Sequence, residues 1–418
     1  MTRHFDILIV GSGHGGAQAA AALRQNKFEG TIAIVGEEAD IPYERPPLSK
    51  DYLMGQKDFE RLLIRPSTFW SDRGIDMITG TRVVQVDAEA HTVETHSGDK
   101  IGYRQLIWAA GGHPRRLTCS GHDLAGVHCV RTRADVDTLR GELNNTLRVC
   151  VVGGGYIGLE AAAALATIGK KVTVIESEGR VLPRVAGETL SRFFEAQHRS
   201  RGVDVRLGIG VDCVEETRGR ASGVKLTNGE TIPCEMVIVG IGIVPSIEPL
   251  LHAGAKSGNG VNVDGSGRTS LPDVFAIGDC ALHTNKYAGG LTIRLESVQN
   301  ANDTANVVAK TITGTAASYN EVPWFWSNQY DLRLQTIGLS QGYDREVLRG
   351  DPANHSFSIV YLKESRVIAL DCVNATRDYV QGRGLVVAGS APPLPALADA
   401  GISLKDLISK PPTEQLRA

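Results

Sequence analysis

The sequence predicts an α/β fold with two Rossmann-like dinucleotide-binding domains and a small α+β C-terminal domain. Two glycine-rich segments with the spacing G-x-G-x-x-G, Gly11–Gly16 and Gly153–Gly158, each follow an apolar strand-like run and precede an alanine-rich stretch. The region after Pro323 mixes strand-like runs such as 358–362 with polar, proline-punctuated segments. With 418 residues, 42% of them apolar, the chain is long enough to bury two or three cores.

The first glycine segment lies between a predicted strand, 5–10, and a predicted helix, 17–23. Gly11 permits the tight turn, Gly13 lets the backbone approach a pyrophosphate, and Gly16 lets helix and strand pack closely. His14 stands inside this segment and is expected to neighbour the phosphates. The helix N-terminus then directs its free N–H groups at an anion, so a phosphate cradle is predicted here.

An acidic residue is expected at the end of the next strand, 31–35, where it would bind an adenosine ribose. Glu37 lies about 20 residues past the last glycine and fits this position. Glu38 is the competing candidate.

The second glycine segment repeats this plan with a strand at 147–152, a helix at 157–168 and a strand at 171–175 that runs into Glu176. A carboxylate at that strand end hydrogen-bonds a free 2′-hydroxyl and repels a 2′-phosphate, so Glu176 favours NADH over NADPH. Arg180 nearby tempers that preference. The predicted NADH contacts of this segment are Gly153, Gly155, Tyr156, Ile157, Gly158 and Glu176.

Three further apolar runs are predicted to be strands that end near a bound nucleotide. Residues 101–112 and 236–245 both end in small residues, among them Ala109, Gly111 and Gly242, whose size allows a close approach. The run 273–279 delivers Asp279 at its carboxyl end, where open α/β sheets bind ligands.

Charge and composition exclude several classes of function. A net charge of −3 and a pI near 6.4 give no global attraction to nucleic acid or to an anionic membrane. The sequence shows neither a signal peptide nor a long apolar span, so a cytoplasmic location is expected. Seven scattered cysteines without a C-x-x-C spacing suggest neither a disulfide framework nor a zinc ribbon, and no metal site is predicted.

These motifs together resemble the pyridine nucleotide:disulfide oxidoreductase superfamily, with its glutathione-reductase-like fold, over about residues 5–310. Segments 41–50, 294–300 and 323–330 resemble the ferredoxin reductases that serve bacterial oxygenases and cytochromes P450. The resemblance implies FAD, NADH and a [2Fe-2S] ferredoxin partner. It also implies an FAD-binding domain of 1–113 and 244–322, an NADH-binding domain of 114–243 and a C-terminal domain of 323–418.

The resemblance further assigns roles to individual residues. Lys50 is expected beside the flavin in an ion pair with Glu160, Trp326 near the flavin, and Arg45 near the FAD phosphates. Lys50, Glu160 and Trp326 form the predicted catalytic set. The predicted FAD contacts are Gly11, Gly13, His14, Gly16, Glu37, Arg45, Lys50, Val83, Ala109, Gly111, Arg131, Asp279, Val298 and Trp326. Some relatives carry an aromatic residue at the position of Val298, so only backbone contacts are expected from it.

The predicted function is electron transfer from NADH through FAD to a [2Fe-2S] ferredoxin that supplies a cytochrome P450 or a ring-hydroxylating oxygenase. Arg294 is a hypothetical contact for the acidic ferredoxin, and a monomer or weak homodimer is expected. A peroxidase, NADH oxidase or CoA-disulfide reductase would need a reactive cysteine near residues 41–45, and none stands there. Rubredoxin reductase and a redox-sensing binding protein resembling apoptosis-inducing factor stay open as alternatives.

Overall fold

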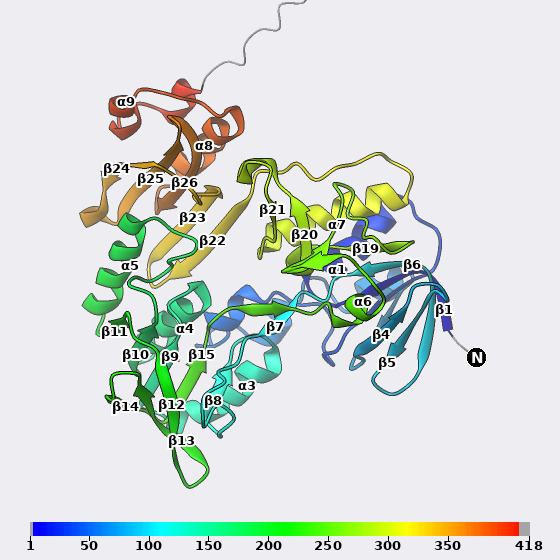
Figure 1. Ribbon diagram of the computed structural model, residues 1–418, viewed down its shortest axis with the longest axis horizontal. Helices are drawn as coiled ribbons and strands as arrows, with labels where there is room; N and C mark the ends of the chain where they lie inside the picture. Colours follow the sequence, from blue (N-terminus) through cyan, green and yellow to red (C-terminus); the bar gives the residue numbers. More distant parts are fainter. Residues whose placement is uncertain (1–2, 409–418) are drawn as a thin grey trace, which may run out of the picture. The chain divides into compact units, whose positions relative to one another are not determined.

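The computed structural model describes residues 3–408. The sequence also predicts a frayed tail from Pro411 onward, which lies outside the described residues. The chain forms two compact units (Figure 1). The first unit comprises 1–48, 55–114 and 243–321, and the second comprises 49–54, 115–242 and 322–418. The short segment Ser49–Met54 thus belongs to a different unit from the residues on either side of it.

The main sheet of the first unit has the strand order β3-β2-β1-β6-β5-β4, with β19 beside β6. Strands β1, β2, β3, β6 and β19 run parallel, and β4 and β5 are antiparallel to their neighbours. The bounds are β1 Arg3–Val10, β2 Ile32–Val35, β3 Ile75–Ile78, β4 Val83–Asp87, β5 Thr92–Thr95, β6 Lys100–Trp108 and β19 Val274–Ala276. Parallel strands need a crossover connection, and the helix between β1 and β2, α1 (His14–Gln25), provides it.

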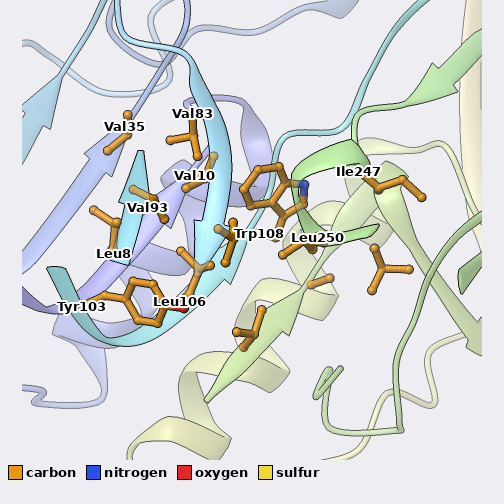
Figure 2. Packing of buried hydrophobic residues seen from close by; sticks show 14 of the residues in the cluster. Leu8, Val10, Val35, Val83, Val93, Tyr103, Leu106, Trp108, Ile247 and Leu250 are labelled. Atoms are coloured by element: carbon orange, nitrogen blue, oxygen red, sulfur yellow. The ribbon is translucent and has the colours of Figure 1, made fainter. Parts of the chain in front are cut away.

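Two hydrophobic clusters cover the opposite faces of this sheet. On one face, alanines of α1 (His14–Gln25) and of α7 (Val298–Ile312) pack on Ile7 and Ile9, because their small side chains allow close approach. On the other face, Val83 and Trp108 pack with Ile247 and with Leu250 of α6 (Glu248–His252), as Figure 2 shows. The sheet is therefore buried on both sides, as expected for parallel strands.

Shorter elements complete the first unit. Strands β7 (Gly112–Pro114) and β16 (Ile243–Pro245) form an antiparallel pair, and a four-stranded sheet has the order β17-β18-β20-β21. Its strands are Ser257–Gly258, Gly260–Asn262, Ala281–Thr284 and Thr292–Ile293. Helical segments are α2 (Thr68–Asp72), η2 (Phe59–Leu62), η4 (Gly278–Cys280) and η5 (Lys286–Ala288), and η1 (Pro46–Ser49) ends on the first residue of the segment Ser49–Met54.

The second unit contains a parallel sheet with the order β11-β10-β9-β15-β8. Its strands are β8 Val127–Cys129, β9 Arg148–Val152, β10 Lys171–Glu176, β11 Asp204–Leu207 and β15 Met236–Val239. Helices α3 (Arg133–Glu142), α4 (Tyr156–Thr167) and α5 (Glu188–Ser200), with η3 (Leu143–Asn145), belong to this unit, as does an antiparallel sheet of β12 (Val211–Thr217), β13 (Arg220–Leu226) and β14 (Thr231–Pro233).

The strand predicted for residues 236–245 is confirmed only for Met236–Val239. Strand β15 ends at Val239, and β16 begins at Ile243 and pairs in a different sheet, with β7. Gly242 has a φ of +99°, a conformation that glycine adopts readily and that redirects the chain between the two strands. The apolar pattern continues through this break because β15 is fully buried and β16 is partly buried, so the pattern alone conceals it.

An antiparallel sheet with the order β22-β23-β26-β25-β24 forms the C-terminal part of the second unit. Its strands are Trp324–Gln329, Leu332–Gly338, Arg366–Val373, Ser356–Lys363 and Arg345–Asp351, and the predicted run 358–362 lies within β25. Helical segments α8 (Thr376–Ala388), α9 (Leu394–Ala398), η6 (Pro352–Asn354) and η7 (Leu404–Leu407) complete it. Within residues 3–408, no helix is long and apolar enough to span a bilayer.

Candidate functional site

The first glycine turn forms a cradle whose shape depends on the absence of side chains. Gly11 has a φ of +115°, and a Cβ there would lie 2.2 Å from the carbonyl oxygen of Ala109. A Cβ on Gly16 would lie 1.9 Å from the carbonyl oxygen of Gly11. Gly13 is the N-cap of α1 with no side-chain hydrogen bond to the helix, and the nearest atom to a Cβ on it is Arg45 Nε at 3.9 Å. The uncapped N–H groups and the space above Gly13 fit a pyrophosphate.

Arg45 belongs to a cluster of polar side chains next to this cradle. Its Nη2 lies 2.5 Å from Glu38 Oε1, and the hydroxyl of Tyr43 donates to the other oxygen of Glu38. The guanidinium also lies over the Tyr43 ring, 5.3 Å from its centroid. The cluster fixes Arg45 close to Gly13, where a cation would complement a bound phosphate.

The two acids that compete for the ribose have different surroundings. Both carboxylate oxygens of Glu38 are engaged by Arg45 and Tyr43, and its side chain is 18% exposed. The side chain of Glu37 is 72% exposed, and its partner Arg82 lies 3.9 Å away and is itself exposed. A long, exposed ion pair is weak, so Glu37 is the acid that can accept a hydrogen bond from a ligand at little cost.

The other residues predicted to contact FAD in the first unit lie around the ends of its strands. Ala109 and Gly111 follow β6, His14 and Val298 are the first residues of α1 and α7, and Asp279 lies in η4. Asp279 was expected at the end of a strand, but β19 ends three residues earlier and a 3₁₀ turn carries the carboxylate. The side chain of Val83 is part of the hydrophobic core (Figure 2), so only its backbone is available to a ligand.

Arg294 is a buried residue rather than a surface arginine. Its side chain is 8% exposed, its Nη1 donates to the carbonyl oxygen of Asp279 at 2.9 Å, and its Nη2 lies 2.7 Å from Glu296 Oε1. Among residues 3–408, its buried Nε has no hydrogen-bond partner. Arg294 therefore supports the turn that carries Asp279, and it offers little surface to a partner protein.

The second glycine turn reproduces the first in backbone geometry. Gly153 has a φ of +111°, and a Cβ there would lie 2.4 Å from the carbonyl oxygen of Gly240. A Cβ on Gly158 would lie 2.0 Å from the carbonyl oxygen of Gly153. Gly155 is the N-cap of α4 without a side-chain cap, and the closest atom to a Cβ on it is 4.0 Å away. A second anion cradle is therefore present at the start of α4.

Glu176 is held rigidly at the end of β10. One carboxylate oxygen accepts the N–H of Gly154 at 2.7 Å, the other accepts the N–H of Glu178 at 2.9 Å, and the residue is 9% exposed. Arg180, which could have served a 2′-phosphate, donates to the carbonyl oxygens of Pro183 and Ala186 and to Ser191 Oγ. Because Glu176 is fixed and the guanidinium of Arg180 is already engaged, the site fits a 2′-hydroxyl better than a 2′-phosphate.

The remaining residues predicted to bind nucleotide in the second unit differ in exposure. Tyr156 packs against the ring of Phe325, with centroids 4.6 Å apart, and Ile157 is 44% exposed. A Cβ on Gly242 would lie 3.7 Å from Arg184 Nη2, which leaves open space there. Arg131 lies just before Thr132, the N-cap of α3.

Lys50 and Glu160 form an ion pair within the second unit, with Nζ 2.5 Å from Oε2, as the pairing hypothesis expects. Ser49 Oγ donates to the same oxygen, and Ser327 Oγ donates to Oε1, each at 2.7 Å. Glu160 is 2% exposed and the side chain of Lys50 14%. Sequence reasoning missed both serines; the available signal was their place within the segments 41–50 and 323–330, which resemble ferredoxin reductases.

Trp326 lies on β22, half-buried, with its ring centroid 5.6 Å from that of Trp324. Alternate residues of a strand point to opposite faces, so Trp324 and Trp326 share one face and Ser327 belongs to the other. Trp326, Lys50 and Arg131 all belong to the second unit, and their approach to a group held by the first unit stays a prediction.

Two of the cysteines, Cys150 and Cys234, are buried side by side with their thiols in hydrogen-bond contact. All seven cysteines are free. Burial raises the pKa of Cys280, which follows Asp279 directly, to about 12 and keeps its thiol protonated. Within residues 3–408, no group of three or more His, Cys, Asp or Glu side chains is placed to bind a metal ion.

Comparison with known proteins finds relatives over nearly the whole length of the chain. The pyridine nucleotide-disulphide oxidoreductase family matches residues 5–305, and a reductase C-terminal domain matches residues 324–408. A ferredoxin–NAD(P)(+) reductase of a Sphingomonas species is 60% identical over 410 residues, which cover 98% of this chain and 99% of the relative.

Solved structures give the same result. The ferredoxin reductase for the CYP199A2 system of Rhodopseudomonas palustris has a TM-score of 0.93 and 38% identity, over 97% of this chain and all of that one. The covalent putidaredoxin reductase–putidaredoxin complex has a TM-score of 0.93 and 34% identity, over 97% of this chain and 98% of that one. The chain thus belongs to the pyridine nucleotide-disulphide oxidoreductase family and, within it, to the ferredoxin–NAD(P)+ reductases that serve oxygenase and cytochrome P450 systems.

Proposed function

We propose that the chain transfers electrons from NADH through FAD to a [2Fe-2S] ferredoxin, which then supplies a cytochrome P450 or a ring-hydroxylating oxygenase. The observation that carries this proposal is the presence of two uncapped glycine cradles, one in each unit. In each cradle the middle glycine borders free space where a pyrophosphate would lie, and the first and last glycines pack directly against backbone atoms.

We assign FAD to the first unit. Gly11, Gly13 and Gly16 would hold its pyrophosphate, with His14 beside them and Arg45 as a fixed cation next to Gly13. Glu37 would accept from the adenosine ribose, Asp279 would bind the ribityl chain, and the backbone of Val83, Ala109, Gly111 and Val298 would border the remainder. When bound, FAD supplies the conversion of a two-electron hydride transfer into single-electron transfers.

We assign NADH to the second unit. Gly153, Gly155 and Gly158 would bind its pyrophosphate, and Glu176, already oriented by two N–H groups, would accept from the 2′-hydroxyl of the ribose. Tyr156, Ile157 and Gly242 would border the nicotinamide half. This arrangement favours NADH because a 2′-phosphate would meet a buried carboxylate.

The ion pair of Lys50 and Glu160 is proposed to act beside the flavin, together with Trp326 and Arg131. The ammonium of Lys50 would stabilise negative charge that develops on the cofactor, and Glu160 would hold the ammonium in place. A fixed cation of this kind needs no reorganisation at the moment of transfer. Trp326 would shield the flavin from water.

The finer features of the partnership are part of the proposal. We expect a ferredoxin of the [2Fe-2S] type, a monomeric or weakly dimeric reductase, and a cytoplasmic location, where NADH is generated. Arg294 stays the candidate ferredoxin contact from the sequence, although its burial restricts it to an edge contact or to support of the Asp279 turn.

Rapid mixing of the FAD-loaded protein with NADH, and then with a ferredoxin, tests the proposal. The flavin absorption should bleach on mixing with NADH, faster than with NADPH, and should recover on addition of a [2Fe-2S] ferredoxin. Preferred reoxidation by rubredoxin would identify a rubredoxin reductase instead. Slow turnover with a persistent charge-transfer band would identify a redox-sensing binding protein, and failure to bind FAD would refute the proposal.

A further inference from the structure

A continuous series of hydrogen bonds crosses the interior of the second unit and ends on Glu160. Tyr330 Oη lies 3.1 Å from His198 Nδ1, and His198 Nε2 lies 2.8 Å from Gln329 Oε1. Gln329 Nε2 donates to Ser327 Oγ at 3.3 Å, and Ser327 Oγ donates to Glu160 Oε1 at 2.7 Å. The series joins α5, β22 and α4 of the same unit.

The hydrogen bonds of this series all point toward Glu160. Burial lowers the pKa of His198 to about 4, so its imidazole is neutral at physiological pH and carries one N–H. Since Gln329 Oε1 can only accept, that N–H lies on Nε2 and is donated to Gln329, and Nδ1 accepts from the hydroxyl of Tyr330. The amide of Gln329 then donates to Ser327, which leaves the serine proton for Glu160. Hydrogen bonds aligned in this way polarise one another and favour a negative charge at the end that accepts.

Burial makes this arrangement specific. His198 and Ser327 are 0% exposed, Gln329 is 1% exposed, and Glu160 is 2% exposed. The members other than Glu160 are neutral, so they orient its carboxylate without competing for the charge of Lys50. Ser327 engages Oε1, whereas Lys50 and Ser49 share Oε2. The two oxygens of Glu160 therefore have separate functions, one facing the cation and the other facing the series.

We propose that Ser327, Gln329, His198 and Tyr330 are positioning residues that hold the carboxylate of Glu160 directed at Lys50 while NADH reduces the flavin. The proposal rests on the proposed function of the Lys50–Glu160 pair. Without the proton of Ser327, the carboxylate would lose the hydrogen bond to Oε1 and could rotate away from its alignment with Lys50. A residue that acts in this way changes the rate of the chemical step and leaves the affinity for NADH unchanged.

Ser327→Ala is the direct test, and Ser358→Ala is its matched control. Ser358 is also 0% exposed, also lies in the C-terminal sheet, and also donates to a carboxylate, Asp378 Oδ2 at 3.0 Å, but it is not connected to Glu160. In single-turnover mixing at saturating NADH, Ser327→Ala should slow flavin reduction by about 10-fold, with the dissociation constant of NADH unchanged. Ser358→Ala should retain the wild-type rate.

Two measurements separate positioning from a purely structural effect. The midpoint potential of the flavin should shift in Ser327→Ala and not in Ser358→Ala, because only the former changes the charge environment of Lys50. Gln329→Leu, which keeps the serine, should slow reduction by about 2- to 3-fold. Equal loss of rate in both serine variants, or a wild-type rate and potential in Ser327→Ala, would overturn the proposal.

The hydrogen-bond series can also be tested without any turnover. In the wild-type FAD-loaded protein, the imidazole nitrogens of His198 should report a neutral ring with its proton on Nε2 by NMR, and Tyr330→Phe should alter the Nδ1 signal. A protonated or Nδ1–H ring would contradict the series even in a protein that NADH reduces normally. Failure of the wild type to be reduced by NADH would instead refute the proposed function.

Discussion

The two glycine cradles have nearly the same backbone and different side-chain surroundings. Their first glycines have φ values of +115° and +111°, and a Cβ on the last glycine would lie 1.9 Å from a carbonyl oxygen in one cradle and 2.0 Å in the other. The acids that follow differ sharply, since Glu37 is 72% exposed in a long ion pair and Glu176 is 9% exposed with two N–H groups on its carboxylate.

This difference separates what the backbone does from what side chains do. The glycine turn and the helix N-terminus provide an anion site in both units. The side chains around that site distinguish the ligands, with Arg45 fixed by Glu38 and Tyr43 in the first unit and Glu176 fixed by the backbone in the second. A cation beside the phosphates suits a tightly held cofactor, and a preorganised acid suits a substrate that must be selected and released.

The largest effect is expected from the last glycine of each cradle. Gly16→Ala and Gly158→Ala place a Cβ against a backbone carbonyl, which no side-chain movement can relieve, so each should destabilise its own unit by about 3 kcal/mol or more. Urea denaturation, monitored with a spectroscopic probe in each unit, should show a lower free energy of unfolding for the substituted unit. Wild-type stability for either variant would show that the helix can move away from the strand, against the account of close packing.

Acid should weaken the second unit through His198. Its pKa is lowered to about 4 by burial, whereas the unfolded residue titrates near 6.5, so the neutral ring contributes stability that is present above pH 6.5 and lost as the pH falls toward 4. The loss amounts to about 3 kcal/mol. Asp371 has the opposite effect on stability, because burial raises its pKa to about 7. The effect of His198 is isolated by comparing the wild type with His198→Gln, since Asp371 is present in both proteins.

Denaturation of these two proteins at a series of pH values measures the effect. The stability advantage of the wild type should shrink steadily as the solution is acidified from pH 6.5 to 4. An advantage that is independent of pH would show that His198 is hydrated or already charged in the folded protein.

The middle glycines should separate binding from folding. A Cβ on Gly13 or Gly155 meets no atom closer than 3.9 Å and 4.0 Å respectively, so Gly13→Ala and Gly155→Ala should fold with stabilities within about 1 kcal/mol of wild type. Each substitution should lower the affinity for the nucleotide of its own cradle by about 10-fold, because the methyl group occupies the space over the helix N-terminus. The FAD content of the purified protein and the KM for NADH report the two effects. FAD loss from Gly155→Ala alone would reverse our assignment of the cradles.

The acids should show a smaller contrast. Glu176→Ala removes an oriented acceptor and should raise the KM for NADH by about 5- to 10-fold while changing the KM for NADPH less, so that selectivity declines. Glu37→Ala, at an exposed site, should lower the affinity for FAD by about 3-fold or less and leave the KM for NADH unchanged. Steady-state kinetics with both nucleotides and FAD titration of the apoprotein check this pair. A larger effect from Glu37 than from Glu176 would contradict the inferred difference in rigidity.

Local patterns in the sequence predict the parts of the molecule in which residue type determines backbone geometry. Gly11 and Gly153 need positive φ angles, and the strands and helices that flank them follow from their apolar runs. The family resemblance added the pairing of Lys50 with Glu160, which lie far apart in the sequence and together in the second unit.

The features that sequence reasoning missed depend on contacts between distant segments. Ser327, Gln329 and His198 are ordinary polar residues in their own neighbourhoods, and only the packing of α5 and β22 makes them one series. The burial of Arg294 was missed for the same reason, since the carbonyl of Asp279 that it binds comes from another element. The break after Val239 was concealed because both halves of the run are apolar.

Anaerobic rapid mixing of the FAD-loaded protein with NADH, followed by a [2Fe-2S] ferredoxin, tests the central claim most directly. The account predicts that the flavin absorption bleaches within one turnover, that Gly155→Ala requires more NADH for the same rate, and that two equivalents of ferredoxin restore the absorption. A flavin that NADH does not bleach, or one that bleaches and is not reoxidised by the ferredoxin, would contradict it.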